Sequence, residues 1–324
     1  MSTPCRVGLW APFSDAEYSA AIAGVDGAEL VRLPDIAALA HEAARLDVLV
    51  TPAGAIFYTQ EVAQILHQKA TRLRWIQVTS AGHDGMAQFG VPQGVLLSGN
   101  GGAFSVPVAE HAMALLLGLT RGLVPALDHQ ASPRWNRARF AGAVGLEGGT
   151  LAIVGLGGIG CEVALRARAF GMTVLGVSRR GRANPVADEV YALSDLPQVL
   201  ARADAVILAL PLVSDTRHLF NADLLAQCKR GAFIVNVGRG ELIETDALCA
   251  ALDRGDLAGA ALDVTAPEPL PDTHPLWRAG NVIITPHIAP LGSRRAIGMI
   301  AGTITQNLAS FVAHRPLAHQ FTLD

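Results

Sequence analysis

Leu151-Ala-Ile-Val-Gly-Leu-Gly-Gly-Ile-Gly160 joins four apolar residues to a glycine-rich turn, and a helical pattern follows over 161–170. The apolar residues predict a short buried strand. Gly155, Gly157 and Gly160 have the G-x-G-x-x-G spacing. The first glycine permits a tight turn, the second lets a pyrophosphate approach the backbone, and the third lets the helix pack closely. The helix N-terminus would face the phosphates with its N–H groups. Glycines alone could form an ordinary turn, but strand, turn and helix in this order predict dinucleotide binding.

Apolar runs recur on both sides of this motif. Five follow it, mostly separated by helical segments, at 173–177, 205–210, 233–237, 260–264 and 282–285. Six strands with one glycine motif on the first predict a doubly wound Rossmann domain. Four shorter runs precede it, at 6–10, 47–50, 73–78 and 95–98, and predict a smaller parallel α/β domain. A hinge is expected at Asn100-Gly-Gly-Ala. The last helical segment, 293–311, is expected to return to the first domain and make it discontinuous.

Composition limits the classes of partner. The chain has 324 residues, of which 51% are hydrophobic and 16% charged, which suits two domains with buried parallel strands. Its formal charge of −3 gives no reason to expect a nucleic acid or an anionic membrane. The four cysteines are scattered without metal-ligand spacing, so we expect reduced thiols and no metal site. The N-terminus has no signal-peptide pattern, and we expect a cytoplasmic protein.

A long helix is predicted over Val106–Leu127, and its apolar pattern continues until Gly122 and Pro125. It is apolar on most of its circumference, so it must be buried nearly all round. Two interpretations remain open, a core helix within its own domain and a subunit interface, and the interface is slightly favoured.

The tip of the second Rossmann strand bears on cofactor choice. An acidic residue about 20 positions after the glycines usually binds the ribose 2′-hydroxyl of NAD. Here the strand ends in Ser178-Arg179-Arg180. Arginine pairs bidentately with phosphate oxygens, so these residues predict a 2′-phosphate and hence NADPH over NADH. The alternative is that both arginines are simply solvated.

Three later strands end in residues that could carry chemistry. Arg239 stands between two glycines after 233–237, Glu268 lies among prolines after 260–264, and His287 follows Pro286 after 282–285. In an open parallel sheet the ligand crevice lies beyond the carboxyl ends of the strands. Each residue alone has an ordinary structural explanation, but their shared placement predicts that all three converge beside the nicotinamide.

At this point the sequence resembles the D-isomer-specific 2-hydroxyacid dehydrogenases. The resemblance is strongest from about 101 to 289 and depends on six motifs: Ser-Ala-Gly-His-Asp (80–84), Val-Ala-Glu-His-Ala-Met-Ala-Leu (108–115), Val-Gly-Leu-Gly-Gly-Ile-Gly (154–160), Asn-Val-Gly-Arg-Gly (236–240), Leu-Asp-Val-Thr-Ala-Pro-Glu-Pro-Leu-Pro (262–271) and Thr-Pro-His-Ile-Ala (285–289). Together these motifs are highly specific.

The resemblance implies a flavodoxin-like substrate domain, made of 1–99 and 288–324, and a Rossmann cofactor domain over 100–287. It implies Arg239, Glu268 and His287 as the catalytic residues, and Ala81, Gly82 and Arg239 as substrate-binding residues. Its cofactor site maps onto Gly155, Gly157, Gly158, Ile159, Gly160, Ser178, Arg179, Arg180, Leu210, Pro211, Thr216, Val237, Gly238 and Asp263. It also implies a homodimer through the long helix.

The implied function is NAD(P)H-dependent reduction of a small 2-oxo acid to a D-2-hydroxy acid. Ser178-Arg-Arg resembles the NADPH-using glyoxylate/hydroxypyruvate reductases, with NAD as the other possible cofactor. Alternatives are an NAD-dependent D-lactate- or phosphoglycerate-type dehydrogenase and a nucleotide-sensing corepressor on the same fold. The sequence does not fix the 2-oxo acid, and Phe57, Tyr58, His83 and Trp135 are candidates to set the pocket size. Arg294 is a further candidate to face the substrate, and a solvated helix start is the favoured alternative.

Overall fold

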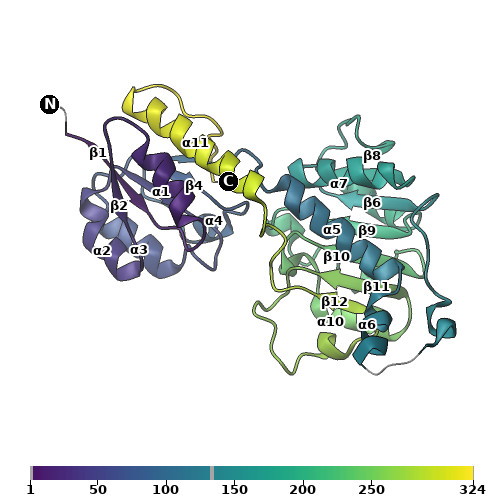
Figure 1. Cartoon of the computed structure of the whole chain (residues 1–324). Coiled ribbons are helices and arrows are strands. Elements are labelled where there is room, and N and C mark those ends of the chain that lie inside the picture. The colour runs from purple at the N-terminus through teal and green to yellow at the C-terminus, as the bar shows by residue number, and fades with distance from the viewer. Residues whose placement is uncertain (1–2, 132–134, 324) are drawn as a thin grey trace. The chain divides into compact units, whose positions relative to one another are not determined.

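The computed structural model describes residues 3–131 and 135–323 in two compact units (Figure 1). Unit 1 is Met1–Phe104 with Ser293–Asp324, and unit 2 is Ser105–Gly292. Both crossings between the units lie a few residues C-terminal to the boundaries that the sequence predicts. No helix in the described ranges is long and apolar enough to cross a membrane.

Unit 1 contains a five-stranded parallel sheet in the order β2-β1-β3-β4-β5, which is the flavodoxin-like order and confirms the predicted fold class. Its strands are β1 (Cys5–Leu9), β2 (Ala28–Arg32), β3 (Val48–Thr51), β4 (Trp75–Val78) and β5 (Leu96–Ser98). Its helices are α1 (Asp15–Ala23), α2 (Ile36–Glu42), α3 (Gln60–Lys69), α4 (Asp84–Phe89) and α11 (Arg294–Val312). The sequence did not predict β2, a half-buried edge strand.

Successive strand residues point to opposite faces of this sheet, so each face has its own core. On one face Val7, Leu9 and Trp75 pack with residues of α1 and α11, including Ile22 and Ile304. On the other face Leu49, Ile76 and Val78 pack with residues of α2, α3 and α4. Helix α11 therefore completes the first face, although it comes from the far end of the chain.

A buried polar network fastens α11 to the sheet. Asn307 is fully buried, and its Nδ2 donates to Gln77 Oε1 at 2.9 Å. Its Oδ1 accepts from the backbone N–H of Ala318 at 2.8 Å. Ser98 Oγ donates to the same Gln77 oxygen at 2.8 Å and accepts from Trp75 Nε1 at 2.8 Å. A buried polar network of this kind stabilises one arrangement because each unpaired group would cost free energy.

Unit 2 contains a seven-stranded parallel sheet in the order β12-β11-β10-β9-β6-β7-β8, which confirms the predicted doubly wound Rossmann class. Its strands are β6 (Thr150–Val154), β7 (Thr173–Ser178), β8 (Glu189–Ala192), β9 (Ala205–Leu208), β10 (Ala232–Asn236), β11 (Leu257–Leu262) and β12 (Val282–Ile284). Its helices are α5 (Ser105–Thr120), α6 (Leu123–Ala131), α7 (Gly158–Ala169), α8 (Leu196–Leu200), α9 (Ala222–Leu225) and α10 (Thr245–Asp253). The edge strand β8 was not predicted.

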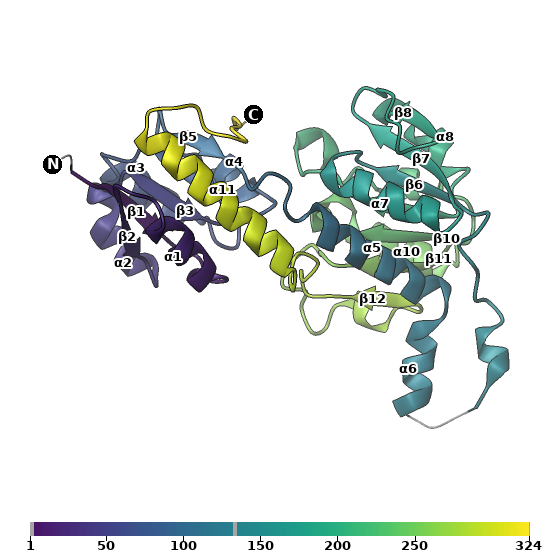
Figure 2. The same ribbon diagram turned by 45° about the horizontal axis from the view of Figure 1, so that its top comes forward.

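The sheet of unit 2 is covered on both faces. Helices α5 and α7 lie side by side on one face (Figure 2). On the other face, alternate residues of β6, β9 and β10 pack with residues of α8 and α10, such as Val199 and Leu248. After β8 the chain crosses from one edge to the far side of β6 and continues with β9. The strand order therefore reverses between β6 and β9, where open α/β sheets bind ligands.

The long helix predicted from Val106 to Leu127 is wrong as a single element. Helix α5 ends at Thr120, and α6 begins at Leu123. Gly122 between them has φ +70°, a left-handed conformation that glycine adopts without strain and that stops a helix. Ten of the sixteen residues of α5 are buried within the single chain, so a core position explains its apolar character.

Candidate active site

The loop after β10 presents Arg239. Asn236 is buried at the end of the strand and holds this loop from inside. Its Nδ2 donates to the carbonyl oxygen of Arg239 at 2.8 Å, and its Oδ1 accepts from the backbone N–H of Gly238 at 3.0 Å. The guanidinium Nη1 of Arg239 donates to the Gly238 carbonyl at 2.7 Å. The half-buried arginine is therefore held at the strand end.

The loop after β11 presents Glu268. Two threonine hydroxyls brace it, since Thr265 Oγ1 donates to Pro267 O and Thr245 Oγ1 donates to Ala266 O, each at 2.9 Å. A Cβ at Gly240 would overlap the carbonyl of Thr265, so the β10 and β11 loops touch directly. Arg239 and Glu268 thus lie on neighbouring loops that are packed against each other.

The loop after β12 presents His287, and its imidazole meets Glu268. His287 Nδ1 lies 2.7 Å from Glu268 Oε1. The backbone of His287 has φ +54°, which is uncommon for a residue with a side chain. Its N–H donates to the carbonyl of Asp263 at 2.8 Å, which helps to hold this conformation. The side chains of His287 and Glu268 are 34% and 29% exposed, so the pair is accessible to a ligand.

The pair controls the charge of the imidazole. The hydrogen bond to Glu268 raises the pKa of His287 above its ordinary value, while desolvation by burial and the nearby Arg239 charge lower it. The net shift of the pKa is upward. A carboxylate that accepts from an imidazole favours the imidazolium, so His287 is suited to donate a proton near neutral pH.

The glycine turn after β6 has the geometry that a dinucleotide requires. Gly155 has φ +110°, and a Cβ there would lie 2.7 Å from the carbonyl oxygen of Ala209 in the β9 loop. A Cβ at Gly160 would overlap the carbonyl of Gly155, so α7 packs directly on the turn. Nothing lies within 4 Å of a Cβ at Gly157, so its backbone is open to a phosphate. Gly157 caps α7 without a side chain, and Gly158 and Ile159 begin the helix.

The tip of β7 lies next to this turn. The backbone N–H of Gly155 donates to the carbonyl of Val177 at 2.8 Å, so Ser178 follows directly beside the glycines. Arg179 and Arg180 are exposed at that tip. This strand tip is the place where a Rossmann domain holds the ribose of a bound dinucleotide.

The loops after β9 and β10 also lie at the carboxyl ends of their strands, next to each other. A Cβ at Gly238 would lie 2.9 Å from the carbonyl of Leu210, so Leu210–Pro211 and Val237–Gly238 are neighbours. Thr216 is buried, and its hydroxyl donates to Pro211 O and accepts from the N–H of Val213, both at 2.8 Å. Its side chain therefore shapes this loop. The residues that the sequence predicts at six strand ends form one continuous edge.

Asp263 behaves differently from the other predicted cofactor residues. Its side chain is 1% exposed, and both carboxylate oxygens accept hydrogen bonds from the segment around His287. The sequence missed two residues in this cluster, Thr285 and His111. A histidine on an apolar helix has no sequence signal that separates it from a core residue.

In unit 1, the loop after β4 carries Ala81 and Gly82. Ser80 Oγ accepts from Ala53 N at 2.8 Å and donates to Gly82 O at 2.7 Å, which fixes the loop. In the described part of the chain, the N–H groups of Ala81 and Gly82 donate no hydrogen bond. Both can therefore bind an anion. Tyr58 is wrong as a candidate pocket residue, because it is fully buried and donates to Gly90 O at 2.9 Å.

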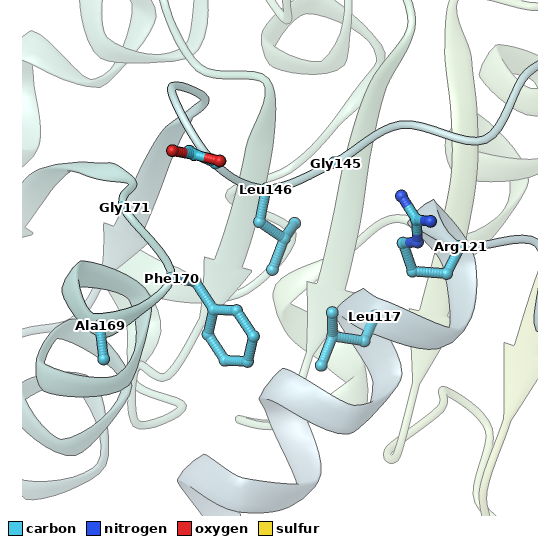
Figure 3. A pocket seen from close by; sticks show the side chains of 8 residues that line it. Leu117, Arg121, Gly145, Leu146, Ala169, Phe170 and Gly171 are labelled. Carbon is cyan, nitrogen blue, oxygen red and sulfur yellow. The ribbon is translucent and has the colours of Figure 1, made fainter.

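A surface hollow of about 520 Å³ lies elsewhere in unit 2 (Figure 3). Leu117, Arg121 and Phe170 are among its lining residues, together with Gly145 and Gly171 before β6 and β7. It is thus at the amino ends of the strands, and none of the predicted site residues lines it. Within residues 3–131 and 135–323, no group of three or more histidine, cysteine or acidic residues could hold a metal ion.

The chain is similar in sequence and fold to known proteins. The family model for D-isomer specific 2-hydroxyacid dehydrogenase, NAD binding domain, matches residues 113–289. A D-3-phosphoglycerate dehydrogenase from Methanocaldococcus jannaschii is 35% identical over 84% of this chain and 51% of its own. A glyoxylate reductase from Pyrococcus furiosus is 32% identical over 82% of this chain and 79% of its own.

Among solved structures, an NADPH-dependent glyoxylate/hydroxypyruvate reductase from Sinorhizobium meliloti, in complex with NADP and sulfate, is 26% identical with a TM-score of 0.82, and 98% of each chain is covered. The chain spans about half the length of the first curated relatives it matches. The match of the family model to more than half of the chain, together with the two parallel sheets, shows that the chain belongs to the D-isomer-specific 2-hydroxyacid dehydrogenases.

Proposed function

We propose that the protein reduces a small 2-oxo acid to the D-2-hydroxy acid, with a nicotinamide cofactor as hydride donor. The observation that carries this proposal is the 2.7 Å contact between His287 Nδ1 and Glu268 Oε1, with Arg239 on the adjoining loop. An acid, its orienting carboxylate and a guanidinium are the groups that a 2-oxo acid needs. They stand at the edge where a Rossmann domain holds its nicotinamide.

Each residue has a distinct role in the proposed reaction. The planar guanidinium of Arg239 pairs with the substrate carboxylate and stabilises negative charge that develops on the carbonyl oxygen. His287 donates a proton from Nε2 to that oxygen, because its Nδ1 is engaged by Glu268. Glu268 keeps the imidazole charged and oriented. The cofactor supplies the hydride, so carbonyl, proton and hydride together give the alcohol.

We propose that NADPH is preferred over NADH. Arg179 and Arg180 are exposed beside the glycine turn, and no acidic residue follows β7 directly. The Sinorhizobium meliloti relative was solved with NADP. Gly155, Gly157, Gly158, Ile159 and Gly160 would hold the pyrophosphate at the N-terminus of α7, and Ser178 would assist at the ribose phosphate.

The cofactor proposal has a direct test. The double variant Arg179→Ala/Arg180→Ala should raise KM for NADPH by at least about 10- to 100-fold, because even one lost charge-assisted hydrogen bond costs roughly 1.5–3 kcal/mol. KM for NADH should change less than about twofold. Arg182→Ala, an exposed arginine two residues further on, is the matched control. Equal effects on both cofactors would contradict a 2′-phosphate site.

The substrate class is tested by a panel of 2-oxo acids with both cofactors. We expect turnover of glyoxylate and hydroxypyruvate with NADPH, the substrates and cofactor for which the Sinorhizobium meliloti reductase is named. Preference for 3-phosphohydroxypyruvate or pyruvate with NADH would favour the phosphoglycerate- or D-lactate-type alternative. Absence of turnover with every member would favour a nucleotide-sensing binding protein.

Two further parts of the proposal concern the whole chain. We propose that unit 2 is the cofactor domain, and that unit 1 is the substrate domain, whose Ala81 and Gly82 N–H groups bind a carboxylate.

We also propose a homodimer in the cytoplasm. Leu123 and Leu127 of α6 are 53% and 65% exposed, and an apolar pair of this kind suits a partner surface. Sedimentation of Leu123→Glu/Leu127→Glu as a monomer would support this assignment.

A further inference from the structure

His111 links helix α5 to the loop that carries His287. Its Nε2 lies 3.0 Å from Thr285 Oγ1 and 3.3 Å from Asp263 Oδ1. The imidazole is 21% exposed, and the Asp263 carboxylate is 1% exposed. The contact therefore lies mostly out of water, where hydrogen bonds are stronger than at the surface. His111 is far from the strand ends in sequence and belongs to none of the motifs assigned a chemical role above.

The hydroxyl of Thr285 fixes the direction of these hydrogen bonds. Its one proton is donated to Asp263 Oδ1 at 2.7 Å. The oxygen of Thr285 can then only accept from His111, so His111 Nε2 must carry a proton. The resulting chain of hydrogen bonds runs from the His111 N–H through the Thr285 hydroxyl to the Asp263 carboxylate.

The Asp263 carboxylate in turn holds the segment around His287. Its Oδ1 accepts from the N–H of Ile288 at 2.9 Å, and its Oδ2 accepts from the N–H of Ala289 at 3.0 Å. Its backbone carbonyl accepts from the N–H of His287 at 2.8 Å. These bonds come from His287, whose φ is +54°, and from the two residues that follow it. A shift of Asp263 or Thr285 would therefore rotate or displace the His287 imidazole.

We propose that His111 is a positioning residue for His287 and acts through Thr285 and Asp263. Its polar contacts within the described residues are with Thr285 and Asp263 and not with Glu268. Its effect is to hold Thr285 and Asp263 from helix α5, so that the His287 imidazole faces the substrate in one orientation. The proposal rests on the function proposed above for His287.

The first test compares two substitutions at this position. His111→Leu removes the donor and should lower kcat about tenfold, because small displacements of an acid are costly, while KM for NADPH changes less than about twofold. His111→Gln keeps an N–H donor at similar reach and should recover kcat to within about threefold of wild type. Glu110→Gln, on the exposed side of the same helix turn, is the control and should keep wild-type kcat.

A double-mutant cycle tests the route. If His111 acts through the hydroxyl, His111→Leu/Thr285→Val should lose no more kcat than the stronger single variant, since the two changes break one chain. If the kcat losses of the two single variants multiply in the double variant, the proposal is overturned. So would wild-type kcat in His111→Leu, or a Gln variant as slow as the Leu variant at equal melting temperature.

Nitrogen NMR supplies a measurement that does not depend on turnover. The ¹⁵N shifts of His111 should show a protonated Nε2, and this resonance should move in Thr285→Val. A proton on Nδ1 alone would overturn the proposed chain. If the wild type reduces no 2-oxo acid, the function proposed for His287 fails, whereas the NMR result still decides whether the His111–Thr285–Asp263 chain exists.

Discussion

His287 combines a raised pKa, a strained backbone and a short hydrogen bond to Glu268. Glu268 raises its pKa, and Arg239 opposes that rise from the neighbouring loop. The left-handed φ of +54° costs about 1–3 kcal/mol for a residue with a side chain, and the bonds to Asp263 offset it. Such strain is typical of residues whose side chain must point in one direction.

The first residue-scale prediction concerns the acid itself. His287→Asn should lower kcat by about 10²–10⁴-fold, because the proton donor is lost. The dissociation constant for NADPH, measured by fluorescence titration, should change little, since the glycine turn is untouched. His41→Asn, at an exposed histidine in unit 1, serves as the control. Full activity of His287→Asn would remove His287 from the mechanism.

The second residue-scale prediction concerns pH. Reduction needs the imidazolium, so kcat should fall as pH rises through the pKa of His287. Glu268 raises that pKa, and Glu268→Gln should therefore move the fall in kcat to lower pH. The measurement is a kcat profile for both enzymes across neutral and alkaline pH. An unmoved or upward-shifted profile would contradict the assigned partner.

At this scale the sequence predicts residues at strand ends and misses those beneath them. Arg239, Glu268 and His287 could be found because each lies within four residues of the end of an apolar run. His111 and Thr285 could not, because their contact joins positions 174 residues apart and depends on how α5 packs under the strands. Tyr58 was misjudged because an aromatic ring in a loop gives no indication of its burial.

At the scale of elements, the glycine turn contains two glycines with opposite surroundings. Gly160→Ala should destabilise unit 2 by about 1–3 kcal/mol, because its Cβ would overlap the Gly155 carbonyl. Gly157→Ala has open space around its Cβ and should cost under about 1 kcal/mol, yet it should weaken NADPH binding. Chemical denaturation and cofactor titration of both variants separate the two effects. Equal losses of stability would contradict this division.

Most apolar strands were predictable, whereas two half-exposed edge strands and the position of one helix break were not. Strands β2 and β8 each border their sheet and are half-exposed, so they lack the continuous apolar run of a central parallel strand. The break between α5 and α6 depends on one left-handed glycine in an otherwise helical pattern. The apolar face of α5 is explained by packing within unit 2, which is the core interpretation that the sequence left open.

At the scale of the whole molecule, the two units should respond separately to substitutions in their cores. Asn307→Leu leaves Gln77 Oε1 with one donor fewer and the N–H of Ala318 unpaired, so unit 1 should lose about 1–3 kcal/mol. Hydrogen exchange should accelerate in α11, β4 and β5 and stay unchanged in β9–β11. Thr303→Val, whose hydroxyl bonds only its own helix, should change stability by less than about 0.5 kcal/mol. Faster exchange throughout both sheets would show that the units unfold together.

The division of unit 1 into two chain segments affects how the protein is made. A ribosome releases all of unit 2 before α11 emerges, so the sheet face with Val7, Leu9 and Trp75 is covered only in part, by α1, until then. The nascent chain therefore offers a chaperone an apolar surface near its beginning, which disappears only when the final helix docks.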